Sequence, residues 1–313
     1  MSIIKDSKDA FNDLPSKAAS NSAPQADAPV DGLDGFSHRY VEVNDVKIHY
    51  VSGGQGPAVV LLHGFPFTWF EWRKIMPQLA AKYTVIAPDL RGMGDSEKPE
   101  ADYAKTNVAD DIWQLIRQLG IGEINLVGRD IGMMVAYAYA AAHPDEVRRL
   151  VLCESLIPGF GLEELMNPAT GGYWHFGFHM QVDIAEMLTK GKEADYLNPM
   201  WQMMAPVKGA EKAAVAEYLR CYSAPGGMRG GFQHYKTLLE DGKTNRANFH
   251  GQLKMPVLSL NGDKGIPQEQ TLHGVRQVAE NVTAELIPNS GHAFAEENPD
   301  WVSDRLIRFF DSE

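Results

Sequence analysis

A strand that turns directly into a helix is the feature that most constrains this chain. The apolar segment 124–127 is typical of a buried strand, and Gly-x-Asp-x-Gly at 128–132 leads into a helix rich in Ala and Met. Gly128 and Gly132 leave room for a sharp turn, because a Cβ at either position would clash with the facing strand or helix. Such a turn pushes the side chain of Asp130 out of its tip.

Strands and helices alternate around this turn. Apolar runs at 58–62, 84–87, 150–153 and 256–260 are typical of strands that are buried on both faces. Amphipathic segments such as 107–119 lie between them. This alternation predicts an α/β fold with a mostly parallel, twisted sheet and helices on both faces.

The alternation stops after the sixth strand. Residues 157–248 contain no convincing strand, are rich in aromatic residues and Met, and are broken by several Pro and Gly residues. A helical insertion of this length between two strands is typical of a cap domain. We therefore expect a core at 36–156 and 249–313 and a helical cap at 157–248.

The first 35 residues have a different composition from the rest of the chain. They are rich in Ser, Ala, Asp and Pro, so they cannot bury enough apolar surface to order themselves. They also lack the apolar core of a signal peptide. We expect a flexible arm at 1–35 and a cytoplasmic protein, with a periplasmic or secreted protein as the alternative.

Charge and cysteine content exclude several classes of function. The 313 residues include 29 basic and 41 acidic residues, for a net charge of −12, which argues against nucleic acid or an anionic membrane as a partner. No apolar stretch is long enough to span a bilayer. Cys153 and Cys221 have no metal-binding spacing, and we expect neither a metal site nor a disulfide.

Several polar residues follow predicted strands, where open parallel sheets place their ligands. Asp130 is one, and His292 follows the last strand in Ser-Gly-His. An acid is needed to orient this histidine, and both Glu154, after the sixth strand, and Asp263, after the seventh, are candidates.

Another motif, His-Gly-Phe-Pro at 63–66, follows the third strand. Its backbone, together with the first turn of the helix after Asp130, suits an oxyanion hole. The donors would be the amides of Phe65 and Ile131.

With these motifs taken together, the chain resembles the epoxide hydrolase and dehalogenase branch of the α/β-hydrolases over residues 37–313. It most resembles the Cif-type epoxide hydrolases. The matching motifs are His63-Gly64-Phe65, Thr68-Trp69-Phe70-Glu71-Trp72, Asp130-Ile131-Gly132, Cys153-Glu154, Trp174-His175-Phe176, and Phe232 with Tyr235.

The resemblance implies a role for each of the core residues. Asp130 would be the nucleophile and His292 the base. Glu154 fits the acid position, since Gly265 stands where other members of the branch carry their acid, and Asp263 remains the alternative. The resemblance implies no cofactor and no metal.

In the cap, the resemblance implies two proton donors that grip an epoxide oxygen, and His175 and Tyr235 match their positions. The substrate pocket would be formed by an aromatic and apolar set of residues, namely Phe65, Met133, Trp174 and Phe176.

The function that this pattern favours is epoxide hydrolysis to a vicinal diol through an alkyl ester on Asp130. The partners would be a small-molecule epoxide and water, and the resemblance leaves a homodimer open. Because the turn holds Asp rather than Ser or Cys, an esterase is disfavoured.

Two alternatives remain open. A haloalkane or fluoroacetate-type dehalogenase would use the same Asp130. However, Phe65 and Ile131 stand where haloalkane dehalogenases have Asn and Trp, and fluoroacetate dehalogenases have Arg at the position of Ile131. A non-catalytic small-molecule-binding protein is the other alternative, and it would be expected to have a damaged triad.

Overall fold

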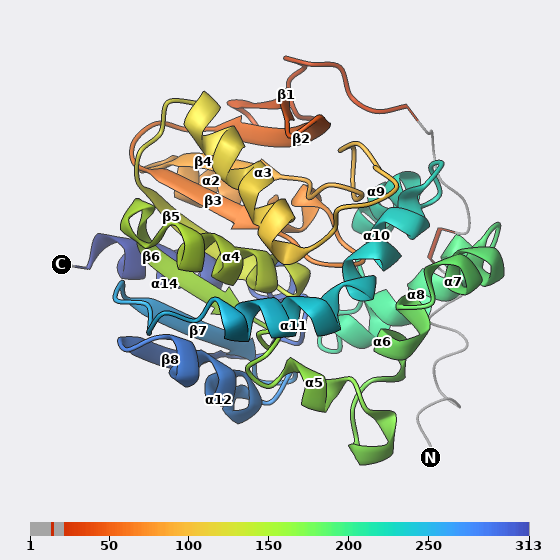
Figure 1. The fold of residues 1–313 in the computed structure, drawn as a ribbon. Helices are drawn as coiled ribbons and strands as arrows, with labels where there is room; N and C mark the ends of the chain where they lie inside the picture. Colours follow the sequence, from red (N-terminus) through yellow and green to blue (C-terminus); the bar gives the residue numbers. More distant parts are fainter. Residues whose placement is uncertain (1–13, 16–21, 313) are drawn as a thin grey trace.

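An eight-stranded sheet forms the centre of the molecule, in the order β1-β2-β4-β3-β5-β6-β7-β8 (Figure 1). The structure is a computed structural model that describes residues 14–15 and 22–312. The β1–β2 and β2–β4 pairs are antiparallel, and all other neighbouring strands are parallel, which confirms the predicted sheet. The strands are β1 (Phe36–Val43), β2 (Val46–Gly53), β3 (Ala58–Leu62), β4 (Thr84–Pro88), β5 (Ile124–Arg129), β6 (Val147–Cys153), β7 (Val257–Gly262) and β8 (Val282–Ile287).

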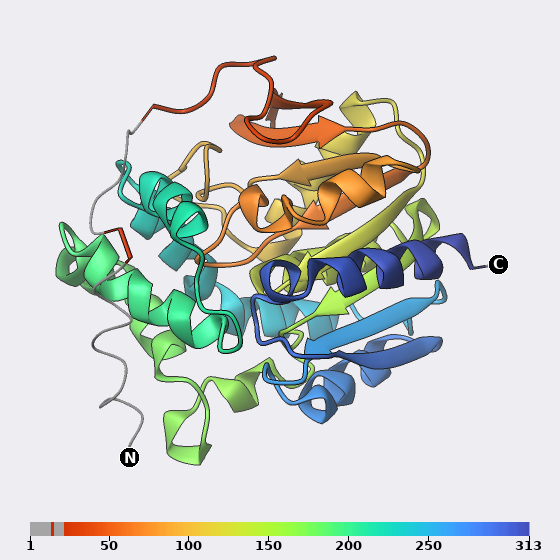
Figure 2. The same cartoon turned by 180° about the vertical axis from the view of Figure 1, so that it is seen from behind.

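Helices cover both faces of this sheet. On one face lie α3 (Lys105–Gln118), α4 (Ile131–Ala142) and α12 (Gln268–Val278), and on the other lie α2 (Met76–Ala80) and α14 (Pro299–Asp311) (Figures 1 and 2). Strand β3 is therefore buried along its whole length, as its unbroken apolar sequence predicts. Three short helices complete the core, namely η1 (Trp69–Trp72), η2 (Pro144–Glu146) and α13 (Phe294–Glu297).

The described chain between β6 and β7 contains helices and loops but no strand, and its helices gather at one end of the sheet (Figure 1). The sequence predicts this helical insertion, and its division from the core at residues 156 and 249 stays our interpretation. In the described residues, no helix has the length and apolar character needed to cross a bilayer. The insertion contains α5 (Leu162–Leu165), η3 (Pro168–Thr170), α6 (Trp174–His179), α7 (Val182–Thr189), α8 (Glu193–Met204), α9 (Lys212–Tyr222), α10 (Gly227–Lys236) and α11 (Leu238–Ala247).

A buried lysine fastens the insertion to the core. Lys105 is the first residue of α3 and is only 1% exposed. Its Nζ donates to the carbonyl oxygen of His234 at 2.7 Å, to Oγ1 of Thr237 at 3.0 Å and to Oδ2 of Asp241 at 3.2 Å. Burial lowers the pKa of Lys105, and the charge of Asp241 opposes that shift. These contacts fix the junction of α10 and α11 against α3.

The second half of the predicted arm at 1–35 contacts the core. Residues 22–35 run beside β1. Asp27 N donates to the carbonyl oxygen of His38 at 2.8 Å, and His38 N donates to that of Ala28 at 2.9 Å. These backbone hydrogen bonds offset the low apolar content of the segment. Residues 1–13 and 16–21 of the predicted arm lie outside the described residues.

Replacing Lys105 by Met should lower the free energy of unfolding by about 3–5 kcal/mol, because it leaves the buried carboxylate of Asp241 without its charge partner. Urea unfolding would measure the change. Lys243→Met is a matched control, since Lys243 pairs with Glu240 where both side chains are largely exposed. Its free energy of unfolding should change by less than about 1 kcal/mol. Equal stability of both variants would contradict a fastening role for Lys105.

Candidate active site

Asp130 stands at the tip of the sharp turn between β5 and α4, as the sequence predicts. Its backbone has φ 54° and ψ −122°, which is unusual for a residue with a side chain. A Cβ on Gly128 would lie 2.2 Å from the carbonyl oxygen of Gly132, and one on Gly132 would lie 2.2 Å from that of Leu62. Both positions therefore require glycine, and the close packing around them holds the strained turn in place.

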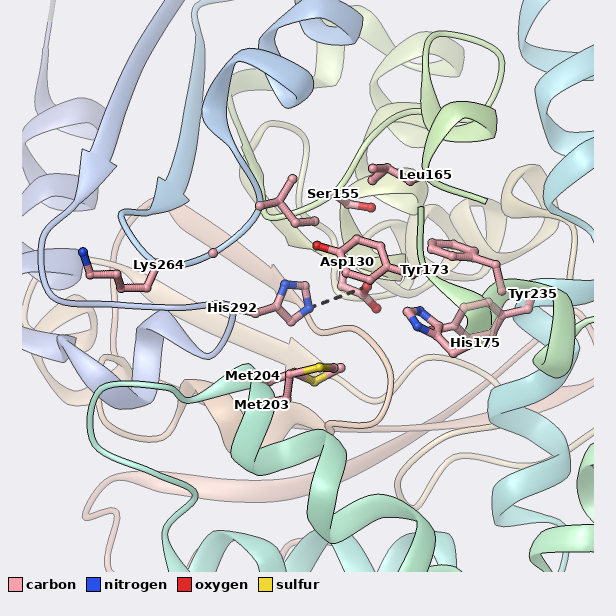
Figure 3. Close-up of a pocket in the computed structure, with 13 residues that line it drawn as sticks. Asp130, Ser155, Leu165, Tyr173, His175, Met203, Met204, Tyr235, Lys264 and His292 are labelled. Carbon is pink, nitrogen blue, oxygen red and sulfur yellow. Dashed lines mark ion pairs between the residues drawn. The ribbon is translucent and has the colours of Figure 1, made fainter. Parts of the chain in front are cut away.

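His292 lies between two carboxylates. Its Nδ1 is 2.9 Å from Oε2 of Glu154. Its Nε2 is 3.7 Å from Oδ2 of Asp130, as the dashed line in Figure 3 marks. Glu154 is fully buried and also accepts hydrogen bonds from the amides of Gly262 at 2.7 Å and Ile266 at 3.1 Å. These three partners fix the Glu154 carboxylate, which in turn orients the imidazole with Nε2 facing Asp130.

The second candidate acid lies elsewhere. Asp263 is exposed, and its Oδ1 accepts from the backbone amide of Ser290 at 3.0 Å rather than from His292. That hydrogen bond lowers the pKa of Asp263. Gly265 is the residue that leaves room for Glu154, since a Cβ there would lie 2.1 Å from the Oε1 atom of Glu154. Of the two candidates, the structure brings Glu154 to the histidine.

Backbone amides meet the carboxylate of Asp130 on one side. The amide of Phe65 donates to Asp130 Oδ1 at 2.9 Å. The amide of Ile131 opens the first turn of α4, where it has no acceptor within the helix, and it makes no hydrogen bond to Asp130 in the described residues. Oδ1 is thus held by Phe65, while Oδ2 faces the histidine and the cavity.

His175 and Tyr235 come from α6 and α10 of the insertion and line the same cavity as Asp130, on the side away from His292 (Figure 3). Their ring centroids are 5.9 Å apart. Burial lowers the pKa of His175 from 6.5 to about 4, with Asp130 opposing and His292 adding to the shift. Burial and the charge of Asp130 raise the pKa of Tyr235 well above 10. Both side chains are therefore neutral hydrogen-bond donors near pH 7.

The cavity above Asp130 has a volume of about 180 Å³. Of the four pocket residues expected from the sequence, only Phe176 lines it. Trp174 is 58% exposed, Met133 is buried in the core, and the ring of Phe65 packs against Tyr235 instead. The lining residues are Asp130, Ser155, Leu165, Tyr173, His175, Phe176, Met203, Met204, Tyr235, Lys264, Gly265, Ile266 and His292.

Four residues that line the cavity are absent from the sequence prediction, namely Ser155, Leu165, Lys264 and Ile266. Ser155 could have been inferred because it directly follows Glu154. Lys264 and Ile266 flank Gly265, the residue that makes room for Glu154. The position of Leu165, in the short helix α5, depends on how the insertion packs.

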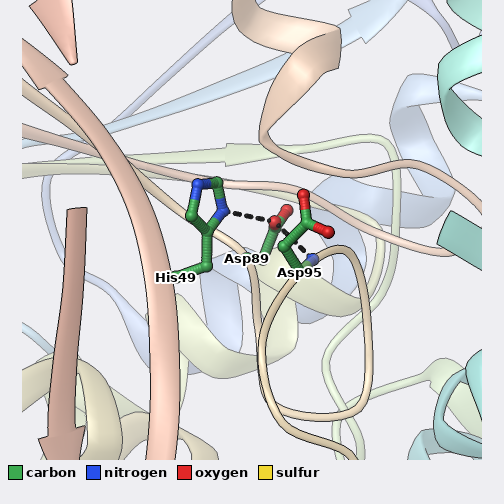
Figure 4. A group of neighbouring side chains, drawn as sticks. All are labelled: His49, Asp89 and Asp95. Atoms are coloured by element: carbon green, nitrogen blue, oxygen red, sulfur yellow. Dashed lines mark hydrogen bonds and ion pairs between the residues drawn. The ribbon is translucent and has the colours of Figure 1, made fainter. Parts of the chain in front are cut away.

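A cluster of His49, Asp89 and Asp95 has the residue types of a metal site (Figure 4). Asp89 already accepts from His49 Nδ1 at 2.8 Å and from the amides of Trp69 and Asp95 at 2.8 and 2.9 Å. Both carboxylate oxygens of Asp95 are bonded to Arg220. Burial alone would raise the pKa of Asp89. The hydrogen bond from His49, the charges of His49 and His63 and the amide of Asp95 together outweigh burial and lower the pKa to about 2. Because these carboxylates already have partners within the protein, we interpret the cluster as a structural network that stabilises the loop after β4.

The fold and these residues define a class of protein. A family model for the alpha/beta hydrolase fold matches residues 57–299, which is more than half of the chain. The chain belongs to the alpha/beta hydrolase fold family, as the sequence predicts.

Within this family, the chain is 35% identical over 282 residues to the soluble epoxide hydrolase of Corynebacterium sp. (strain C12), covering 88% of this chain and 97% of that protein. It is 32% identical over 296 residues to a fluoroacetate dehalogenase of Burkholderia sp., covering 90% and 95%. The crystal structure of the Cif epoxide hydrolase from Acinetobacter nosocomialis superposes with a TM-score of 0.82 at 27% identity, over 97% and 95% of the two chains. The predicted resemblance to epoxide hydrolases of the Cif type is confirmed.

Replacing Gly265 by Ala should displace Glu154 from His292, because the new Cβ would occupy the space of its carboxylate. We expect the downfield proton resonance of the His292 Nδ1–H to be lost and the free energy of unfolding to fall by about 1–3 kcal/mol. Proton NMR and urea unfolding would measure the two effects. Gly122→Ala is the control, because a Cβ at Gly122 meets nothing within 4 Å. It should keep the His292 resonance and the wild-type free energy of unfolding. A Gly265→Ala protein with the resonance unchanged would contradict this packing.

The lowered pKa of His175 also predicts a pH dependence of stability. Between pH 6.5 and about 4 the unfolded chain binds a proton at this residue and the folded chain does not. The free energy of unfolding therefore rises with pH in this range. A His175→Gln protein should lose less stability than the wild type when the pH falls from 7 to 4, as measured by urea unfolding at each pH. Parallel losses in the two proteins would show that His175 is not buried as a neutral ring.

Proposed function

We propose that this chain is an epoxide hydrolase that converts a neutral epoxide to a vicinal diol through a covalent ester on Asp130. The observation that carries the proposal is the two-sided cavity: Asp130 faces His292 on one side and the donors His175 and Tyr235 on the other. A nucleophile opposite two neutral donors is the arrangement needed to open a strained ether in line.

In the first half-reaction, Oδ2 of Asp130 attacks an epoxide carbon and forms an ester. The C–O bond of the ring breaks, and its electron pair stays on the epoxide oxygen. That oxygen takes a proton from Tyr235 or His175, and the donor later regains it from solvent. Hydrogen bonds from both donors weaken the bond that breaks, because they stabilise the developing alkoxide.

In the second half-reaction, a water molecule gives a proton to Nε2 of His292 while its oxygen bonds to Cγ of Asp130. The negative charge develops on Oδ1, which the amide of Phe65 already holds at 2.9 Å. The amide of Ile131, in the first turn of α4, would become the second donor. The tetrahedral intermediate then expels the diol, which takes the proton from His292, and Glu154 stabilises the charged imidazole in between. Asp130 is left as a carboxylic acid and releases its proton to solvent, which restores the carboxylate.

The lining of the cavity supports a compact, neutral substrate. The apolar part of the lining consists of Leu165, Phe176, Met203, Met204 and Ile266, and the volume of about 180 Å³ is below the roughly 300–1,000 Å³ of most ligand sites. An apolar or aromatic epoxide therefore fits better than a long or charged one.

Dehalogenation is the second candidate, because a fluoroacetate dehalogenase is among the relatives. No arginine lines the cavity to hold a substrate carboxylate, and Arg129 is fully buried in an ion pair with Glu71. Lys264 does line the cavity, but its amine points away from Asp130 (Figure 3). The side chains of Phe65 and Ile131 cannot donate to a halide. A non-catalytic role is disfavoured, because Asp130, His292 and Glu154 are in contact as an intact set.

Two further properties are also proposals, and only the first of them rests on the resemblance. One is a homodimer. The other is a cytoplasmic location. It agrees with Cys153 and Cys221 being free and buried, because a fold without disulfides needs no oxidising compartment.

Replacing His292 by Gln should block the second half-reaction and spare the first. An aryl epoxide incubated with the variant should give a protein whose mass rises by the mass of the epoxide, with the adduct on Asp130. Intact-protein mass spectrometry would measure it. As a complement, wild-type enzyme in excess over substrate in ¹⁸O-water should carry the label in Asp130 after one turnover.

A different set of outcomes would contradict the proposal. Label that passes directly into the diol would mean that water attacks the epoxide without an ester. Halide release from fluoroacetate or bromoalkanes, without diol formation from any epoxide in a panel, would favour the dehalogenase.

A further inference from the structure

Arg129 is a fully buried charged residue that the two half-reactions do not use. It ends β5 and directly precedes Asp130 in the chain. Its Nε forms an ion pair with Oε2 of Glu71 at 2.7 Å, with both side chains at most 1% exposed. Its guanidinium carbon lies 4.2 Å from the ring centroid of Phe67. Glu71 and Phe67 both belong to the segment that follows the oxyanion residue Phe65.

The third contact of Arg129 reaches the base. Its Nη1 donates to the backbone carbonyl oxygen of His292 at 3.2 Å. It is the only side chain with a hydrogen bond to the backbone of His292 in the described residues. The backbone amides of the neighbouring residues donate to other groups. The amide of Ser290 donates to Asp263, that of Gly291 to Glu297, and that of Ala293 to the carbonyl oxygen of Met204.

We propose that Arg129 is a positioning residue that ties the base to the nucleophile strand and the oxyanion segment, and that its main effect is on ester hydrolysis. This inference rests on the proposed function. One planar guanidinium can contact a carboxylate and a carbonyl at the same time, so it fixes the distance between the segments that carry Phe65 and His292. A small shift of His292 is enough to move its Nε2 out of hydrogen-bonding distance of the water that attacks the ester on Asp130.

Asp130 itself does not depend on Arg129 to the same degree. Its amide donates to the carbonyl oxygen of Cys153 at 3.1 Å, its carbonyl oxygen accepts from Met133 N at 3.0 Å, and its carboxylate is held by Phe65. Loss of the guanidinium should therefore leave the nucleophile in place while the base loses its backbone anchor. Since His292 takes a proton only in the second half-reaction, the two steps should separate.

The test compares the two half-reactions in single turnover, with the ester followed by intact-protein mass spectrometry. In Arg129→Met, ester formation should stay within about threefold of wild type, while ester hydrolysis should slow about 100-fold, so that the adduct accumulates. Arg129→Lys keeps the charge beside Glu71, but one ammonium cannot hold Glu71 and the carbonyl of His292 as a fork does. Its hydrolysis should slow about tenfold, which corresponds to the loss of one hydrogen bond.

Arg91→Met is the matched control. Arg91 also forms a buried pair, with Nε and Nη2 at 2.6 and 2.5 Å from the carboxylate oxygens of Asp111, but it makes no contact with the triad. Its loss should lower stability and leave the ratio of the two rates unchanged. Equal slowing of both steps in Arg129→Met, or the same change of ratio in Arg91→Met, would overturn the proposal.

The outcomes also separate this inference from the function on which it rests. If His292→Gln forms no adduct with any epoxide that the wild type turns over, the proposed two-step function fails. If His292→Gln forms the adduct and Arg129→Lys hydrolyses its ester at the wild-type rate, the function stands and the role of Arg129 is wrong. The lysine variant keeps the second outcome accessible even if Arg129→Met does not fold.

Discussion

The strained backbone of Asp130 is the constraint on which the rest of the structure depends. A positive φ at a residue with a side chain persists only where the surroundings hold it. Here the surroundings are the close approaches at Gly128 and Gly132, which pack β5, α4 and β3 against one another. The sheet order places β5 between β3 and β6, so the segments that follow all three strands meet at the nucleophile. Phe65, Asp130 and Glu154 come from these three segments.

The sheet core and the helical insertion both contribute to the site, and they have different roles. The core supplies the charged groups, and a network of backbone amides and one buried arginine holds them, because charges in a low-dielectric interior need partners. The insertion supplies neutral donors, since burial keeps His175 unprotonated and Tyr235 protonated. The buried amine of Lys105 joins the core to the insertion near α10, the helix that carries Tyr235. This division suits a reaction in which the core forms and hydrolyses the ester while the cap handles the leaving oxygen.

The choice between Glu154 and Asp263 illustrates what sequence reasoning could reach. Both residues follow strands at the correct edge of the sheet, so their positions along the chain leave both open. The glycine at 265 points to Glu154 only through the resemblance to known enzymes. In three dimensions its reason is steric, because the Glu154 carboxylate fills the space that a side chain at 265 would need. Asp263 instead accepts a hydrogen bond from the amide of Ser290, which lies in the same loop as the base.

The sequence by itself determined the sheet, the turn at Asp130, the order of the catalytic candidates and the helical insertion, because periodicity, glycine positions and strand ends are local properties. Only the tertiary structure decided which cap side chains face the cavity. Trp174 and Phe176 are two residues apart in one helix, yet the first is exposed and the second lines the pocket. It also decided that Arg129 pairs with Glu71 and reaches His292. Those contacts join segments far apart in the chain, and side-chain direction on a helix or loop is set by packing against such distant partners.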